Sequence, residues 1–247
     1  MSAFSSSQTE KERRPRVVLV TGSSRGVGRS VAEALIEQGD FVFGCSRSGE
    51  PPFAHERYRH GSLDVTDEKA VRTMIAEITT AYGRIDITVN NAGVSSSRLG
   101  LLTSASDFTT VLQANLVGAF VVMRESMRVM KRAKFGRIIN FSSINVPLAS
   151  LGAAPYNASK AGLENLCITL SRECAADDIT INCIGLSLVG NSGMVDSLSQ
   201  SAISAKQEEL IKPSLLEVGE IIHAINFFAA PEARNITGQT IYFGGVS

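Results

Sequence analysis

A buried strand that leads directly into a glycine-rich turn and a helix is the feature that most limits how this chain can fold. Residues 16–20 read Arg-Val-Val-Leu-Val, a nearly unbroken apolar run typical of a strand covered on both faces of a parallel sheet. The turn at residues 21–28 contains Gly22, Gly26 and Gly28, and an amphipathic helix follows it. A strand, a tight glycine turn and a helix in this order predict the opening unit of an α/β fold.

Strands and helices alternate along the rest of the chain. Further strands are predicted at residues 41–45, 85–89, 137–141, 180–184 and 240–243. Further helices are predicted after a cap at Thr66, at residues 108–130, after Pro155 and at residues 218–228. Because parallel strands need crossover connections, and these are right-handed, the alternation predicts a parallel sheet with helices on both faces.

The predicted domain organisation is a disordered tail at residues 1–14 and a single domain at residues 15–247. The tail is polar and contains Glu10 and Glu12, so it resembles neither a signal peptide nor a transit peptide. Residues 186–213 break the alternation, because they are rich in Ser, Leu and Gly and show no clear strand. They follow the carboxyl end of a strand, where ligands bind in such folds. We interpret them as a mobile lid, and a plain surface insertion is the alternative.

The composition argues against several classes of function. The 247 residues carry a formal net charge of +0, which argues against nucleic acid or an anionic membrane as the partner. No apolar run approaches the ~18 residues of a membrane span, and no targeting segment is recognisable, so a cytoplasmic protein is expected. The 4 cysteines form no C-x-x-C pair and indicate small buried side chains in a reducing compartment. The sequence shows no metal site.

The glycine turn indicates a dinucleotide site. Its spacing, G-x-x-x-G-x-G, lets the backbone turn tightly, approach a pyrophosphate closely and aim a helix N-terminus at it. An NAD site usually has an acidic residue at the end of the second strand, but Arg47 stands there. A guanidinium binds the 2′-phosphate of NADPH, and Arg25 adds a second positive charge, so NADPH is predicted over NADH. The alternative for Arg47 is a solvated residue at a strand end.

Tyr156 and Lys160, with Ser143 upstream, are the candidate catalytic residues. Positions i and i+4 of a helix share a face, with Cβ atoms ~5–6 Å apart. An ammonium ~4 Å from a phenol, at an effective dielectric of ~20, contributes about 4 kcal/mol toward the phenolate, which predicts a depressed pKa for Tyr156. Such a tyrosine exchanges a proton with an alcohol or a ketone near neutral pH. Tyr-x-x-x-Lys alone is common, so this interpretation depends on the motifs around it.

Several motifs, in order and at the expected spacing, make the chain resemble the classical short-chain dehydrogenase/reductase family. The resemblance runs from about Arg16 to the C-terminus. The motifs that carry it are residues 21–28, Asp64-Val65, Asn90-Asn91-Ala92-Gly93, Asn115, Ser143, and Tyr156 with Lys160. The resemblance implies a single Rossmann-type domain with a doubly wound, seven-stranded parallel sheet, and it implies a homotetramer.

The resemblance also implies roles for individual residues. Ser143 would bond the substrate carbonyl and Tyr156 would deliver a proton. Lys160 would bind the nicotinamide ribose and depress the pKa of Tyr156, while Asn115 would hold a water. The implied catalytic set is Asn115, Ser143, Tyr156 and Lys160. The implied cofactor-binding set is Gly22, Ser24, Arg25, Gly26, Val27, Gly28, Arg47, Asp64, Val65, Asn91, Ala92, Gly93, Tyr156, Lys160 and Val189.

The chain departs from the family pattern at two places. Leu186-Ser187 stands where Pro-Gly is usual, just before the segment that cradles the nicotinamide carboxamide, and this changes the loop next to Val189. Near the end of the chain, Tyr242-Phe243-Gly244-Gly245 replaces the more usual Asp-Gly-Gly. Neither departure removes a catalytic group.

The layout resembles that of 3-oxoacyl carrier-protein reductases, so NADPH-dependent reduction of a 3-oxoacyl thioester or a similar ketone is the predicted activity. A carrier protein is acidic, and Arg128, Lys131, Arg132 and Lys134 would form a basic patch near the mouth of the site. Asp177-Asp178 would oppose such a patch, and a solvated helix end is its alternative. The other functions considered are an alcohol dehydrogenase or epimerase of the same fold, and a cofactor-binding scaffold without catalysis.

Overall fold

The computed structural model describes residues 14–95, 97–190, 192, 195 and 199–245. The predicted disordered tail therefore lies outside the described residues, apart from Arg14. Several residues of the predicted lid also lie outside them, among them Met194 and Leu198.

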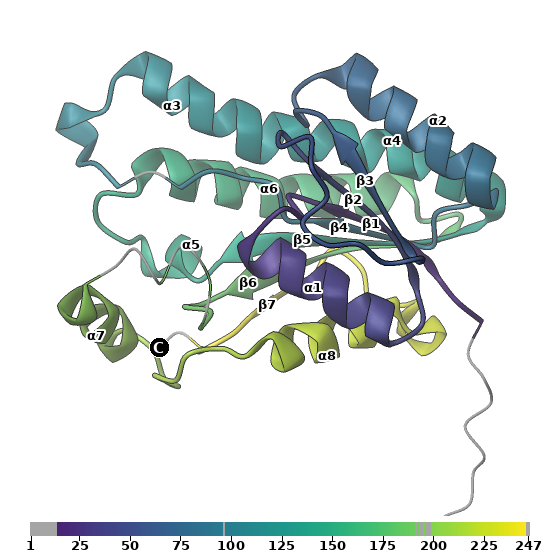
Figure 1. Ribbon diagram of the computed structural model, residues 1–247. Coiled ribbons are helices and arrows are strands. Elements are labelled where there is room, and N and C mark those ends of the chain that lie inside the picture. The colour runs from purple at the N-terminus through teal and green to yellow at the C-terminus, as the bar shows by residue number, and fades with distance from the viewer. Residues whose placement is uncertain (1–13, 96, 191, 193–194, 196–198, 246–247) are drawn as a thin grey trace, which may run out of the picture.

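A sheet of seven parallel strands forms the centre of the protein (Figure 1). The strand order is β3-β2-β1-β4-β5-β6-β7, with the order reversing between β1 and β4. The strands are β1 Val17–Thr21, β2 Phe41–Ser46, β3 Tyr58–Ser62, β4 Ile87–Asn90, β5 Phe135–Ser143, β6 Asp178–Leu186 and β7 Thr240–Tyr242. This confirms the predicted doubly wound α/β sheet of the Rossmann type.

Helices cover both faces of the sheet (Figure 1). The α-helices are α1 Gly26–Glu37, α2 Glu68–Tyr82, α3 Ala105–Leu112, α4 Gly118–Ala133, α5 Asn145–Leu148, α6 Ala154–Glu173, α7 Gln200–Glu208 and α8 Val218–Ala229. Short 3-10 turns lie at Gly100–Leu102 and Pro231–Ala233, and a π-helical turn lies at Gln113–Val117. Helices α1 and α8 cover one face of the sheet, and α2, α4 and α6 cover the other.

Strict alternation of side chains along β1 explains the two cores. Val18 and Val20 point to the core shared with α1 and α8, whereas Val17 and Leu19 point to the core shared with α2, α4 and α6. All four are at most 1% exposed. A strand buried on both faces needs an unbroken apolar run, which is what the sequence has at this position.

Three local predictions were wrong or incomplete. Strand β3 was not predicted, because its sequence Tyr-Arg-His-Gly-Ser is polar and it pairs only with β2 at the sheet edge. Asp67, not Thr66, caps α2, since its side chain accepts a hydrogen bond from the amide of Ala70. The long helix predicted at residues 108–130 is interrupted by the π-helical turn, which separates α3 from α4.

Among the described residues, the continuous helical stretch Ala105–Ala133 is long and apolar enough to cross a membrane by length and composition. In the fold its second half supplies the core under the sheet, with Val122, Met123 and Met130 fully buried. Its apolar character therefore has a structural explanation as a core helix.

Candidate active site

The candidate site lies at the carboxyl edge of the sheet, where the strand order reverses. In open α/β sheets, diverging connections at such a reversal leave a crevice that binds ligands. The glycine turn follows β1, residues 91–94 follow β4, and Ser143 ends β5. The fold therefore brings together motifs that lie more than a hundred residues apart in the sequence.

At two positions of the turn, neighbouring atoms approach so closely that only glycine fits. Gly22 has a φ of +69°, and a Cβ there would lie 2.9 Å from Ala92 Cα. A Cβ on Gly28 would overlap both the carbonyl oxygen of Gly22 and the side-chain amide of Asn91. Asn91 donates that amide to the carbonyls of Thr21 and Gly22, at 2.9 and 3.0 Å. The Asn91 side chain thus holds the glycine turn in place.

The start of α1 points its free amides toward this turn. The helix begins at Gly26, whose φ is +54°, and Arg25 precedes it in an extended conformation. Among the described residues no side chain caps this helix start. Ser24 is half-buried and Arg25 is exposed beside it. Uncapped amides at a helix N-terminus favour an anion, so the turn fits a pyrophosphate.

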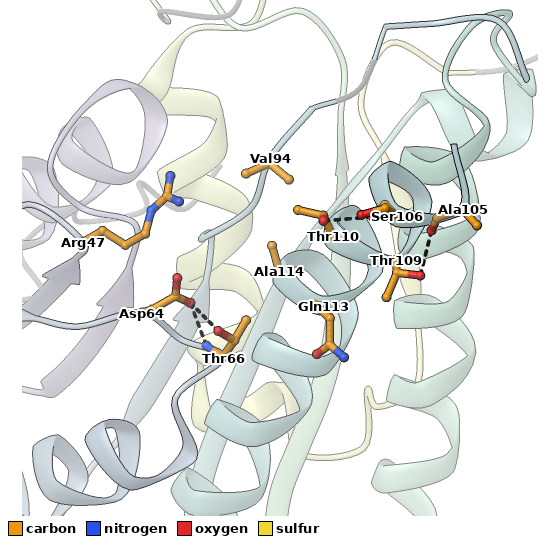
Figure 2. A pocket seen from close by; sticks show the side chains of 10 residues that line it. All are labelled: Arg47, Asp64, Thr66, Val94, Ala105, Ser106, Thr109, Thr110, Gln113 and Ala114. Atoms are coloured by element: carbon orange, nitrogen blue, oxygen red, sulfur yellow. Dashed lines mark hydrogen bonds between the residues drawn. The ribbon is translucent and has the colours of Figure 1, made fainter. Parts of the chain in front are cut away.

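A cavity of about 520 Å³ adjoins the ends of β2 and β3. Figure 2 shows Arg47, Asp64 and Thr66 on one side of it and the residues of α3 and the π-helical turn on the other. Asp64 accepts hydrogen bonds from the amide and the hydroxyl of Thr66, at 2.9 and 2.8 Å. These bonds, with a smaller effect from the charge of Arg47, hold the pKa of Asp64 below its usual range. The cavity has the size and polarity to receive an adenosine moiety.

Val65, unlike Asp64, is not among the residues that line this cavity. Its side chain packs against Gly118 at the start of α4, where an added Cβ would lie 2.6 Å from Val65 Cγ2. It belongs to the apolar core rather than to the lining of the cavity.

Ser143, Tyr156 and Lys160 meet beside the end of β5. Tyr156 and Lys160 lie one turn apart on α6, and the Lys160 Nζ is 5.7 Å from the centre of the Tyr156 ring. Ser143 is buried and hydrogen-bonds the Tyr156 side chain. Lys160 is also buried, and its Nζ donates to the carbonyl oxygen of Phe141 at 2.7 Å. The two α6 side chains thus share a face, as their spacing predicts.

The electrostatics of this group differ from the expectation. Burial raises the pKa of Tyr156, and the hydrogen bond with Ser143 opposes this only in part. Burial also lowers the pKa of Lys160, to about 8. The expected acidic tyrosine is therefore wrong for the protein alone. The physical reason is that the ammonium points to the Phe141 carbonyl, while burial disfavours the charged form of both groups.

Asn115 links the loop after β4 to α6. It lies in the π-helical turn, a feature that is frequent at functional sites. Its Oδ1 accepts from the amide of Val94 at 2.7 Å, and its Nδ2 donates to the Val94 carbonyl and to the Ser159 hydroxyl. A Cβ on Gly93 would lie 2.9 Å from Asn115 Oδ1. Asn115 therefore fixes the Val94 backbone, next to Gly93, against α6, whereas its role in holding water stays a prediction.

A family model described as short chain dehydrogenase matches residues 16–202. The chain belongs to this family. A Haemophilus influenzae protein named 3-oxoacyl-[acyl-carrier-protein] reductase FabG is 32% identical over 93% of this chain and 97% of its own length. Proteins of the same name match at 31% in Vibrio cholerae, over 93% of this chain and 96% of theirs. Another, from Staphylococcus aureus, matches at 33% over 92% and 96%. The protein is thus an oxidoreductase of the CH-OH/C=O type.

In this short chain dehydrogenase the backbone around Val189 is held against Leu216 despite the altered loop. Val189 bridges to Leu216 through the Leu188 carbonyl and the Gly190 amide, at 2.8 and 2.9 Å. The amide and carbonyl of Val189 itself are thereby directed away from Leu216, and the Ser192 hydroxyl donates to that carbonyl at 2.6 Å. Leu186, in place of the usual proline, continues β6 and pairs with Ser143.

The prediction of a basic patch near the mouth of the site is wrong. Arg128 and Lys131 lie in the last turns of α4, which ends just before β5 begins, so they lie at the amino edge of the sheet, opposite Ser143. Arg128 pairs with Glu125, and Lys134 pairs with Asp177 at 2.6 Å. Asp177 therefore forms an ion pair with Lys134 at this edge of the sheet.

Two polar groups near the site were not predicted. The hydroxyls of Ser23 and Tyr58 are hydrogen-bonded at 3.0 Å, and His60 bridges Tyr58 to Ser46 at 2.8 and 3.0 Å. This network ties the glycine turn to the strand that precedes Arg47. Alternation of Tyr58 and His60 was the one sequence signal for it. The second group is centred on Glu164, whose carboxylate accepts hydrogen bonds from Ser142 and Tyr242. Its one signal in the sequence was the i+4 spacing of Glu164 from Lys160.

Proposed function

We propose that this short chain dehydrogenase is an NADPH-dependent reductase of a 3-oxoacyl thioester or a similar ketone. The observation that carries the proposal is the meeting of Ser143, Tyr156 and Lys160 beside the dinucleotide crevice. When bound, the reduced nicotinamide supplies a hydride to the carbonyl carbon. The names of the relatives support the 3-oxoacyl substrate.

The three side chains have separate tasks in the proposed mechanism. Ser143 hydrogen-bonds the substrate oxygen, on which negative charge grows as the carbonyl is reduced. Tyr156 donates its phenolic proton to that oxygen. Because burial raises the pKa of Tyr156, the phenol is protonated at neutral pH, which suits an acid in the reductive direction. Lys160 holds the nicotinamide ribose, and Asn115 keeps the neighbouring loop and α6 in register.

The cofactor would be held along the crevice from the glycine turn to the loop after β6. The turn would take the pyrophosphate, the cavity beside Asp64 the adenosine, and the backbone of Val189 the carboxamide. The absence of a side chain at Gly22 and Gly28 fits this, since a Cβ at either would overlap the surrounding backbone. Arg47 lines the cavity and stands at the end of β2, where an NAD site usually has an acidic residue, which favours a 2′-phosphate. The residues proposed to hold the cofactor are those of the predicted set: Gly22, Ser24, Arg25, Gly26, Val27, Gly28, Arg47, Asp64, Val65, Asn91, Ala92, Gly93, Tyr156, Lys160 and Val189.

The proposal extends to the surroundings of the site. Residues 186–213 act as a lid of which α7 is the described helical part. The substrate is free or attached to an acyl carrier protein, the protein works in the cytoplasm, and it forms a homotetramer. Carrier-protein docking has no support from the basic residues of α4, because these lie at the opposite edge of the sheet.

The test is an absorbance assay with NADPH and a panel of 3-oxoacyl thioesters, free and attached to a carrier protein. Loss of the reduced-cofactor band is expected with the wild-type protein, and Tyr156→Phe is expected to lose turnover while it still binds NADPH. Tyr82→Phe is the matched control, because it removes a phenol at the end of α2, away from the site. Turnover only from NADP⁺ and an alcohol would instead identify an alcohol dehydrogenase. Bound cofactor with no turnover on any ketone or alcohol would identify a scaffold.

A further inference from the structure

Glu164 is a carboxylate that the proposed reaction does not use, and it lies one helical turn after Lys160. Positions i and i+4 share a helix face, with Cβ atoms ~5–6 Å apart. The Oε1 of Glu164 accepts from the hydroxyl of Ser142 on β5, and its Oε2 accepts from the phenol of Tyr242 on β7, at 2.6 Å. Each carboxylate oxygen thus has a hydroxyl donor from a different strand, which fixes the charge in place.

The neighbouring strand leaves room for Tyr242 to reach Glu164. A Cβ on Gly185 would overlap the Tyr242 ring, so the glycine on β6 makes room for the phenol that reaches Glu164. Burial raises the pKa of Tyr242, and the hydrogen bond and charge of Glu164 raise it further. Tyr242 therefore stays protonated and remains a donor over the whole working range of pH. This gives a physical reason for the tyrosine at the place where the chain departs from the family pattern.

Lys160 needs a negative partner more than an exposed lysine does. It is 5% exposed, and its hydrogen bond to the Phe141 carbonyl is to a neutral acceptor. Three groups favour its charged form against burial, namely Cys183, Glu164 and Cys167. The bond to Cys183 and burial raise the pKa of the Cys167 thiol well above its ordinary value, which favours its neutral form. Glu164 is the carboxylate among these groups, and it lies one turn after Lys160 on the same face of α6.

We propose that Glu164, fixed by Ser142 and Tyr242, is a positioning residue that keeps the buried Lys160 ammonium charged. This deepens the proposed function, on which its catalytic meaning rests, since a charged lysine is the form that holds the ribose hydroxyls. Glu164 touches neither substrate nor cofactor in this assignment and acts through Lys160. Tyr242 and Ser142 act through Glu164.

The test is a titration of Lys160 by NMR in protein labelled at the lysine ε-carbon. The sequence has 7 lysines, and Lys160→Met identifies the signal by its loss. The wild-type midpoint is expected at about 8. In Glu164→Gln it is expected lower by about one pH unit or more, since loss of a neighbouring opposite charge shifts a pKa by ~1–3 units. Glu173→Gln, exposed at the end of the same helix, is the matched control and should leave the midpoint unchanged.

An unchanged midpoint in folded Glu164→Gln would overturn the proposal. So would an equal or larger fall in Cys183→Ala, because the thiol would then be the partner of Lys160. If Glu164→Gln does not fold, Tyr242→Phe is the deciding variant. Its Lys160 midpoint is expected to fall by less than that of Glu164→Gln, and an unchanged midpoint would refute the assignment. The titration needs no turnover, so its outcome does not depend on whether the proposed function is correct. Where turnover is observed, the alkaline limit of kcat/KM should move down in Glu164→Gln by the same amount, and Glu164→Asp should restore part of it.

Discussion

Gly28→Ala offers the sharpest test of the dinucleotide crevice. A Cβ at this position would overlap the carbonyl oxygen of Gly22 and the side-chain amide of Asn91. To relieve the overlap Asn91 must leave its two carbonyl partners, at ~1 kcal/mol for each lost hydrogen bond. The backbone overlap adds ~1–3 kcal/mol, as in other overpacked sites. The expected total is a loss of about 3–5 kcal/mol in the free energy of unfolding.

The assay for Gly28→Ala is urea unfolding, with NADPH binding measured in parallel by fluorescence. A loss of about 3 kcal/mol corresponds to ~6–12 °C in Tm for a chain of this size. Binding is expected to weaken by about tenfold or more, because the turn must shift away from the position proposed for the pyrophosphate. Gly219→Ala is the matched control, since this helical glycine on α8 has open space around its Cβ position. It should be neutral or stabilise by ~0.5–1 kcal/mol. Wild-type stability and affinity in Gly28→Ala would refute the close-approach argument.

Three further predictions follow from single side chains. Arg47→Asp should weaken NADPH far more than NADH in a binding titration, and equal effects would remove its assignment to the 2′-phosphate. Lys160→Met should abolish turnover yet stabilise the protein at pH 7 by up to about 3 kcal/mol, because burial lowers the pKa of Lys160 from 10.5 to about 8. The free-energy cost of burying charged Lys160 is complete below pH 8 and disappears above pH 10.5. The free energy of unfolding of the wild type should therefore rise between these pH values, and that of the variant should not. Asp67→Ala should lower the Tm of the protein through loss of ~0.5–2 kcal/mol of helix capping, and Thr66→Ala should lower it less.

The sequence was sufficient for the parts of the fold that depend on local pattern. The apolar run at β1 and the apolar spacing of α1 and α2 report burial directly, and they lie where the pattern predicts. Strand β3 was not predictable in this way, because a polar edge strand is stabilised by pairing with β2 rather than by its own burial. The π-helical turn could not be predicted either, since the contacts of its Asn115 are with Val94 and Ser159, which lie far away in the sequence.

The candidate site shows the same division. Sequence spacing placed Tyr156 and Lys160 on one helix face, but it gave the wrong sign for the pKa of Tyr156. The sign depends on burial and on the direction of the Lys160 ammonium, and both are properties of the packed structure. The basic residues after Met127 were misplaced for a related reason. Their distance from the site depends on which edge of the sheet α4 reaches before β5.

The direction of the two pKa shifts has a consequence for the reaction. Burial raises the pKa of Tyr156 and lowers that of Lys160, so the protein alone favours the neutral phenol and brings the lysine close to its own midpoint near neutral pH. A neutral phenol beside Ser143 can give a proton to an oxygen that becomes negative, but it cannot accept one from an alcohol. In the proposed mechanism the folded site therefore favours reduction, and oxidation would first require loss of the Tyr156 proton. A pH profile in both directions tests this, because reduction should extend to lower pH than oxidation, and identical profiles would contradict the burial argument.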